Sequence, residues 1–190
     1  MRDISQHIMD IAQNSVKARA NEIEILVNES PKEKYFEFEI RDNGMGMDEK
    51  MCKRVFDPFV TTRDKKIRHV GLGLSLLKAN AERSGGYVEL VSHPNKGTRV
   101  KALFKMDSID CPPVGALGGA FLSLIICDSA LHWRIIRKYA EKKYILDTCK
   151  IKKTLGVQKL SSVKMYSILK EYIERLESNV KHNGGEEHGG

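Results

Sequence analysis

The feature that most constrains the fold is an amphipathic helix near the start of the chain, predicted within residues 3–20. Asp3 and Gln6 have the spacing of a helix-capping residue and its partner three positions later. Apolar side chains then recur at helical spacing, at Ile4, Ile8, Ile11 and Val16. This stripe predicts that one face of the helix packs into the core.

A second side of the same helix is polar. Asp10, Asn14 and Lys17 lie at positions i, i+4 and i+7, so they share one face. A carboxylate, a carboxamide and an ammonium group in a row could serve as a base, a metal ligand and a phosphate contact. For the helix in isolation, a solvated surface is the simpler interpretation. The motifs that follow in the chain favour the functional one.

The next segments alternate between apolar and polar residues and predict two antiparallel strand pairs, each joined by a turn. A polar, basic loop separates the pairs; it is either a solvated linker or a lid whose cations reach over phosphates. The expected elements are strands 23–27 and 35–41, a helix over 48–55, the loop 64–69, a helix opened by residues 70–74 and running to 83, and strands 87–92 and 98–105.

Two glycine-containing segments are candidates for ligand contact. Asp42, Gly44 and Gly46 follow a strand, where glycines let the backbone approach a ligand and the carboxylate can accept hydrogen bonds from an amino group. Alone, this segment could be a plain turn. A calcium loop is excluded because glycines occupy the third and fifth ligand positions. Gly71 and Gly73 open a helix, whose free N–H groups and dipole favour an anion.

Five motifs in order resemble the ATP-binding domain shared by DNA gyrase, Hsp90-type chaperones, sensor histidine kinases and MutL proteins, the GHKL superfamily. They are Asp10 to Asn14, Asp42 to Gly46, Phe56 to Thr62, Gly71 to Leu74, and Gly97-Thr98. The match spans residues 3–106. It implies a Bergerat-type α/β two-layer sandwich with a mixed, mostly antiparallel sheet, helices on one face, and ATP and Mg²⁺ as cofactors.

The resemblance also implies roles for individual residues. Asn14 matches the magnesium ligand, and Asp42 matches the aspartate that binds the adenine amino group, with Thr98 assisting through water. Lys17 matches a phosphate contact of the histidine kinases. The remaining nucleotide-binding positions implied by the motifs are Gly44 and Gly46, which make room for the base, Phe59, Thr61 and Thr62, and Gly71, Leu72, Gly73 and Leu74.

Two residues depart from the superfamily pattern. His69 stands where a glycine is usual, so the lid could hinge differently. Asp10 stands where gyrase, MutL and the anti-sigma serine kinases carry a catalytic glutamate, which would orient and deprotonate water or a serine hydroxyl. Aspartate reaches about 1.5 Å less far, and a displacement of that size can cost about 100-fold in rate. Slow turnover is therefore expected; alternatively, Asp10 is only a surface charge.

The sequence predicts three regions: an ATP-binding domain over residues 1–106, an α+β extension over 107–181 and a disordered tail over 182–190. The extension is either a regulatory or dimerising module or a small subdomain that covers the exposed face of the sheet. Its expected elements are a linker over 107–113, an apolar helix over 114–129, a hairpin of strands 132–137 and 143–147, a short helix over 150–155, and a helix from Ser161 or Ser162 to about Val180.

Composition and charge argue against several other classes of function. The net charge is +7, but the basic residues are spread over both halves, which disfavours a dedicated nucleic-acid surface. The four cysteines show no metal-binding spacing and no signal peptide is evident, which indicates a cytoplasmic protein. The longest apolar run, residues 114–127, is too short to span a membrane.

Three functions fit the sequence. The first is a protein kinase or phosphoryl-transfer regulator that acts in trans on a protein partner, in the manner of the anti-sigma kinases. The second is a slow MutL-like ATPase switch that could form a homodimer, and the third is an ATP sensor without hydrolysis. A self-phosphorylating sensor kinase is disfavoured, because Met1 adjoins the first helix and leaves no room for a phosphoacceptor hairpin before it.

Overall fold

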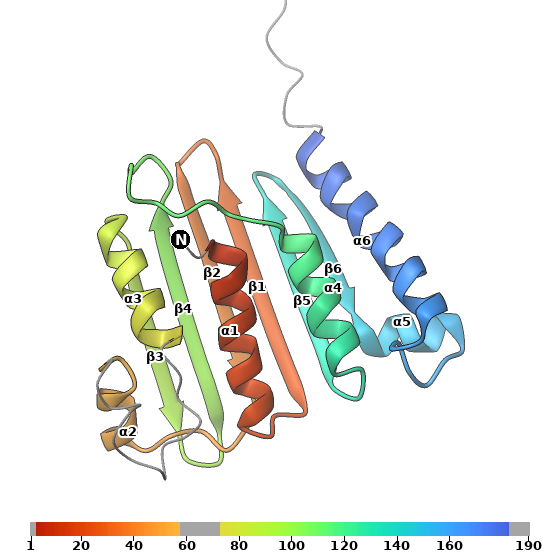
Figure 1. Ribbon diagram of the computed structural model, residues 1–190, viewed down its shortest axis with the longest axis horizontal. Coiled ribbons are helices and arrows are strands. Elements are labelled where there is room, and N and C mark those ends of the chain that lie inside the picture. Colours follow the sequence, from red (N-terminus) through yellow and green to blue (C-terminus); the bar gives the residue numbers. More distant parts are fainter. Residues whose placement is uncertain (1–2, 58–72, 183–190) are drawn as a thin grey trace, which may run out of the picture.

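The computed structural model describes residues 3–57 and 73–182, which form one sheet and six helices (Figure 1). In chain order these elements are α1 (Ile4–Lys17), β1 (Glu22–Ser30), β2 (Tyr35–Asp42), α2 (Glu49–Arg54), α3 (Gly73–Arg83), β3 (Tyr87–His93), β4 (Gly97–Lys105), α4 (Leu117–Cys127), β5 (His132–Tyr139), β6 (Lys142–Asp147), α5 (Thr148–Leu155) and α6 (Val163–His182).

The six strands form a mixed sheet in the order β3-β4-β2-β1-β5-β6. Four neighbouring pairs are antiparallel, and only β1 and β5 run parallel. Helices α1, α3 and α4 lie side by side across one face of the sheet (Figure 1). The predicted two-layer α/β sandwich with a mostly antiparallel sheet is therefore confirmed.

The core lies between α1 and the centre of the sheet. Ile4, Ile8 and Ile11 are at most 3% exposed, as the helical spacing predicts, whereas Val16 is only half-buried. The inward side chains alternate along the central strands, at Ile23, Ile25 and Val27 of β1 and Phe36, Phe38 and Ile40 of β2. This period-two burial is the pattern of strands covered on one face.

The ends of α1 follow local rules. Asp3 accepts a hydrogen bond at 2.8 Å from the backbone N–H of Gln6, which confirms the predicted cap. The helix ends at Lys17, three residues before the predicted limit. Arg19 has a φ of 60°, in the left-handed region, and so cannot continue a right-handed helix. The chain there turns directly into β1.

The extension continues the same sheet instead of forming a separate layer. Its strand β5 pairs with β1 along Glu22 to Glu29, and β6 completes the predicted hairpin. The linker passes the start of α1, where the N–H groups of Ile4 and Ser5 donate to Pro113 and Val114 at 2.9 Å. Helix α4 begins at Leu117, later than predicted, because Gly115 has a φ of +79°.

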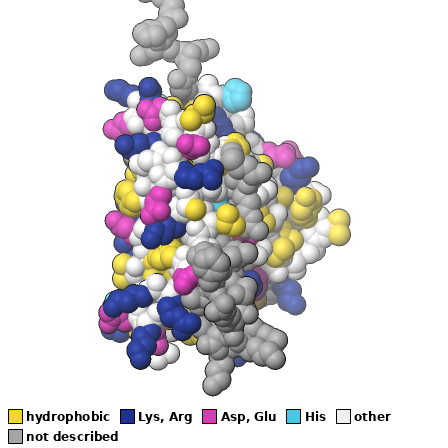
Figure 2. Space-filling model, turned by 60° about the vertical axis from the view of Figure 1, so that its left-hand side comes forward, with side chains coloured by type: hydrophobic (Ala, Val, Ile, Leu, Met, Phe, Trp, Pro, Cys, Tyr) yellow, Lys and Arg dark blue, Asp and Glu magenta, His cyan; other side chains and the backbone are white. Residues whose placement is uncertain are grey.

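Two features of the described residues bear on the partners expected from the sequence. Among residues 3–57 and 73–182, no helix has both the length and the hydropathy needed to cross a membrane. On the face shown in Figure 2, basic and acidic side chains are interspersed instead of forming one basic patch.

Candidate functional site

A cavity of about 430 Å³ opens beside the C-terminal half of α1. Its apolar walls come from α1, β2 and β4, through Ile11, Ile40 and Val100. Three methionines complete them: Met45 and Met47 of the loop after β2, and Met51 of α2. The predicted polar residues that line it are Asn14, Lys17, Asp42 and Thr98. A mostly apolar cavity of this size with a few fixed polar groups is typical of small-molecule sites.

Asp42 is the most firmly held polar group of the cavity. Its Oδ2 accepts a hydrogen bond from the Ser15 hydroxyl at 2.6 Å, and its Oδ1 accepts from the backbone N–H groups of Gly44 at 2.9 Å and Thr98 at 3.2 Å. These donors come from α1, the loop after β2 and the start of β4. The carboxylate is thus held in one orientation at the cavity wall, where it can also accept from a ligand amino group.

Beside Asp42 lies a pair of hydroxyl groups, those of Ser92 and Thr98. The Ser92 hydroxyl donates to the carbonyl of Gly97 at 3.0 Å and accepts from the N–H of Met47 at 2.8 Å. Because its one proton is used in this way, the contact of 2.9 Å between Ser92 and Thr98 has the Thr98 hydroxyl as donor. The lone pairs of Thr98 then remain available to a ligand or a water molecule.

The loop after β2 needs glycine at Gly46. This residue has a φ of +64°, and a Cβ atom there would lie 2.0 Å from the carbonyl oxygen of His93. The backbone of the loop is therefore pressed against the turn between β3 and β4. This close approach is to the protein's own backbone, so the predicted role of Gly46 in making room for a ligand stays a prediction.

The other end of the site is formed by α1 and the start of α3. A Cβ atom on Gly73 would lie 3.4 Å from the Cβ of Asp10 and 3.6 Å from its Oδ2, so the Asp10 side chain faces the backbone of Gly73. Gly73 is the first residue of α3, where helix N–H groups and the dipole favour negative charge. Asn14 lies one turn along α1 from Asp10. Carboxylate and carboxamide oxygens are the ligands that Mg²⁺ prefers.

The comparison with protein families identifies this arrangement. Residues 2–108 match the family described as histidine kinase-, DNA gyrase B-, and HSP90-like ATPase. The match covers more than half of the chain. The chain belongs to this ATPase family.

Curated relatives with sequence similarity to this chain include kinases. It is 30% identical over 103 residues to Sporulation kinase A of Bacillus subtilis, which covers 53% of this chain and 16% of that protein. It is 37% identical over 109 residues to Sensor protein KdpD of Clostridium acetobutylicum, which covers 55% of this chain and 11% of that protein. The chain thus spans less than a fifth of either relative.

Solved structures extend the likeness beyond the family match. The MutL ATPase domain of Aquifex aeolicus, complexed with ADP, superposes with a TM-score of 0.53 over 90% of this chain and 70% of that one, at 11% identity. The N-terminal domain of a DNA repair protein gives a TM-score of 0.56 at 17% identity, covering 97% of this chain and 58% of that one. These likenesses show that this chain shares its fold with both proteins.

The structure brings most of the predicted residues of the ATPase together. Asn14, Lys17, Asp42, Gly46, Leu74 and Thr98 line the cavity, Gly44 hydrogen-bonds Asp42, and the Asp10 side chain faces Gly73. Their roles toward a nucleotide stay predictions. The remaining predicted positions, Phe59, Thr61, Thr62, Gly71 and Leu72, lie outside the described residues, as do the lid 64–69 and the unusual His69.

Sequence analysis missed two hydroxyl groups. Ser15 follows Ile11 by four residues and so continues the apolar stripe of α1. A hydroxyl on a buried face needs a hydrogen-bond partner, so this position could have been flagged. Ser92 gave no such signal, because its contacts arise from the pairing of β3 with β4, in which Ser92 lies opposite Thr98.

Proposed function

We propose that this ATPase is a phosphoryl-transfer regulator, a protein kinase that acts in trans on a protein partner. The observation that carries the proposal is that the Asp10 side chain faces Gly73, the first residue of α3. It supports a carboxylate at the end of the site where the superfamily resemblance places the phosphates. The relatives, which include Sporulation kinase A and Sensor protein KdpD, support phosphoryl transfer.

In the proposed complex, each residue acts from the position described above. Asp42 accepts a hydrogen bond from the adenine amino group, and the lone pairs of Thr98 receive a bridging water. Asn14 holds Mg²⁺ through its carboxamide oxygen, and the bound ion offsets the charge of the phosphates. Asp10 accepts the proton of the attacking hydroxyl, either of a serine or of water.

A second candidate is an ATPase switch, in which nucleotide binding changes the conformation and no protein is phosphorylated. The likeness to the MutL ATPase domain favours it, because that likeness spans 90% of the chain and therefore includes part of the extension. Both candidates use the same cavity and the same carboxylate. They differ in the acceptor of the phosphoryl group.

Labelling with γ-³²P-ATP distinguishes these candidates. The full chain is incubated with labelled ATP, Mg²⁺ and an extract of cells, and both protein-bound label and free phosphate are measured. Label on a protein band is the expected result. Free phosphate alone would favour the switch, and the absence of both, with ATP binding intact, would leave a sensor without turnover.

The variant Asp10→Asn tests the catalytic role directly. We expect it to abolish turnover while ATP binding stays within about twofold, because the carboxamide keeps the size of the side chain and loses the basic oxygen. Glu82→Gln is the matched control, since Glu82 is a surface carboxylate of α3 with a side chain 56% exposed. Equal turnover in wild type and Asp10→Asn would remove Asp10 from the mechanism.

A further inference from the structure

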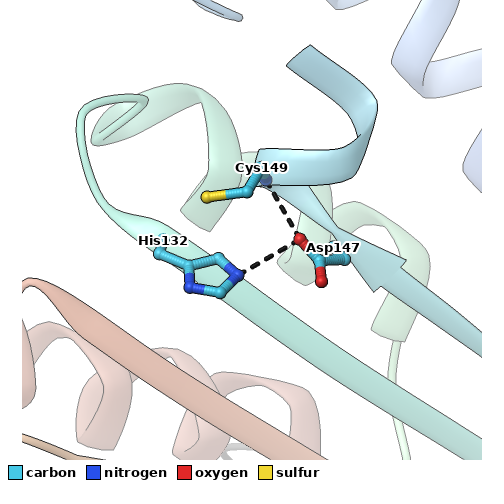
Figure 3. A group of neighbouring side chains, drawn as sticks. All are labelled: His132, Asp147 and Cys149. Carbon is cyan, nitrogen blue, oxygen red and sulfur yellow. Dashed lines mark hydrogen bonds and ion pairs between the residues drawn. The ribbon is translucent and has the colours of Figure 1, made fainter. Parts of the chain in front are cut away.

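Three potential metal ligands meet outside the ATP cavity, where the extension joins the sheet. His132 begins β5, Asp147 ends β6, and Cys149 lies in the first turn of α5. One ligand atom of each lies within 4.8 Å of the other two. Figure 3 shows the imidazole, the carboxylate and the thiol around a common space.

The imidazole of His132 lies between two carboxylates. Its Nε2 is 3.1 Å from Oδ1 of Asp147, and its Nδ1 is 3.4 Å from Oε1 of Glu22. A neutral imidazole carries one N–H and can donate to only one of them. In the structure Nε2 hydrogen-bonds Asp147, so Nε2 carries the proton of a neutral ring. A metal ion at Nε2 would replace that proton, and Nδ1–H would then donate to Glu22. This is how a second carboxylate commonly orients a metal-bound histidine.

Asp147 has a free oxygen for a ligand. Its Oδ1 caps α5 by accepting from the backbone N–H groups of Cys149 at 3.1 Å and Lys150 at 3.2 Å. No described residue donates a hydrogen bond to its Oδ2, although the side chain is only 13% exposed.

We propose that His132, Asp147 and Cys149 bind one divalent transition-metal ion of the zinc type, with a fourth position open to water. Thiolate and imidazole ligands select zinc and its neighbours over Mg²⁺ and Ca²⁺. Two ligand atoms about 2.0–2.2 Å from a tetrahedral ion lie roughly 3.3–3.6 Å apart. Nε2 of His132 and Oδ1 of Asp147 are 3.1 Å apart, close to that value, and the three ligand atoms all lie within 4.8 Å of one another.

The geometry argues against a nucleophilic Cys-His-Asp triad at the same place. In a triad the thiol and the carboxylate contact opposite nitrogens of one imidazole. Here both ring nitrogens of His132 face carboxylates, which leaves the thiol of Cys149 without a base. The dipole at the start of α5 acts against a cation. Two anionic ligands, Asp147 and the thiolate of Cys149, offset it.

Cobalt(II) is the probe for this site, because a thiolate–Co²⁺ bond gives a near-ultraviolet charge-transfer band that other ligands do not. The full chain is titrated with Co²⁺ under reducing conditions and without nucleotide. We expect the band to saturate at one ion per chain and to disappear when Zn²⁺ is added. Cys149→Ser should abolish the band, whereas Cys127→Ser, which alters the other exposed cysteine, should retain it.

Two further variants test the geometry. Asp147→Asn keeps a capping side chain on α5, so it should fold normally and weaken Co²⁺ binding by at least tenfold. Glu22→Gln should weaken binding by about 10- to 100-fold, as expected for a group that orients a ligand. The proposal is overturned if the band never appears, if it survives Cys149→Ser, or if Cys127→Ser removes it.

Discussion

At the scale of single residues, the cavity depends on Asp42. Its two oxygens are held by Ser15, Gly44 and Thr98, which lie far apart in the sequence. Because three groups hold this carboxylate, it keeps its orientation before a ligand arrives. Ligand binding therefore loses little free energy to the ordering of the Asp42 side chain. The contribution of Asp42 to nucleotide affinity can be measured separately from its contribution to the stability of the fold.

Asp42→Asn should weaken ATP binding by about 1.5–3 kcal/mol, the usual range for a hydrogen bond to a charged group. Isothermal titration of ATP into wild type and variant measures the difference. Glu37→Gln is the matched control, because Glu37 lies on the same strand and pairs with Lys101 at 2.9 Å on the open face. Equal ATP affinity for Asp42→Asn and wild type would refute the adenine assignment.

At the scale of elements, a cluster of charged side chains around the buried Arg137 connects α6 to the sheet. Arg137 of β5 is fully buried, forms an ion pair with Glu29 of β1, and lies 3.4 Å from Glu177 of α6. The hydroxyl of Tyr144 donates to Glu177 at 2.5 Å, and burial together with this carboxylate raises the pKa of Tyr144. Three elements therefore share one set of buried charges.

Arg137→Ala should lower the free energy of unfolding by about 3–5 kcal/mol, because it leaves the buried carboxylate of Glu29 without its cation. Arg134→Ala is the control, since Arg134 lies on the same strand with its side chain 42% exposed and should cost about 1 kcal/mol or less. Urea unfolding of both variants measures the difference. Similar losses for the two would show that the buried cluster has no special role.

Charges also cover the open face of the sheet. Glu39 lies between Arg41 and Arg99, with Nη2 of Arg99 at 2.7 Å. Burial alone would raise the pKa of Glu39, but hydrogen bonds from Arg99 and Arg41 hold it below its ordinary value of 4.5. The ionised form therefore stabilises the folded state at neutral pH.

This stabilisation should be lost in acid. Because the pKa of Glu39 is lowered on folding, its contribution is present above its ordinary pKa and disappears as the pH falls through the lowered value. Glu39→Gln should reduce stability by about 1 kcal/mol at neutral pH and by nothing once Glu39 is protonated. Urea midpoints of both proteins across the acid range give the difference. A difference independent of pH would contradict this account.

At the scale of the whole molecule, the extension and the ATPase region share one sheet and one core. Strand β5 covers the edge of β1 over its first eight residues, and α4 packs beside α1. Residues 1–106, the region predicted from the sequence, would therefore expose an open strand edge without the extension. Such edges promote association between chains.

A fragment of residues 1–106 should unfold at lower urea than the full chain and should associate in solution. Light scattering after size-exclusion chromatography measures the association, and urea unfolding measures the stability. Deletion of residues 183–190 is the control, because it removes no residue of the sheet or its helices. A monomeric fragment with the midpoint of the full chain would instead support residues 1–106 as an independent domain.

The sequence by itself determined the local structure and the ATPase family. Alternation predicted the strands, the stripe of α1 predicted its buried face, and Asp3 predicted its cap. These features depend on neighbours within a few residues, which the sequence displays directly. The five ordered motifs added the family, because each motif keeps its own local spacing.

Only the tertiary structure decided which distant residues meet. The parallel pairing of β1 with β5 had no local signal, because a parallel partner can lie anywhere in the chain. The same holds for the contact between Ser15 and Asp42 and for the group of His132, Asp147 and Cys149. Their meeting depends on strand order and register, which the packing of the whole core fixes and no short stretch of sequence contains.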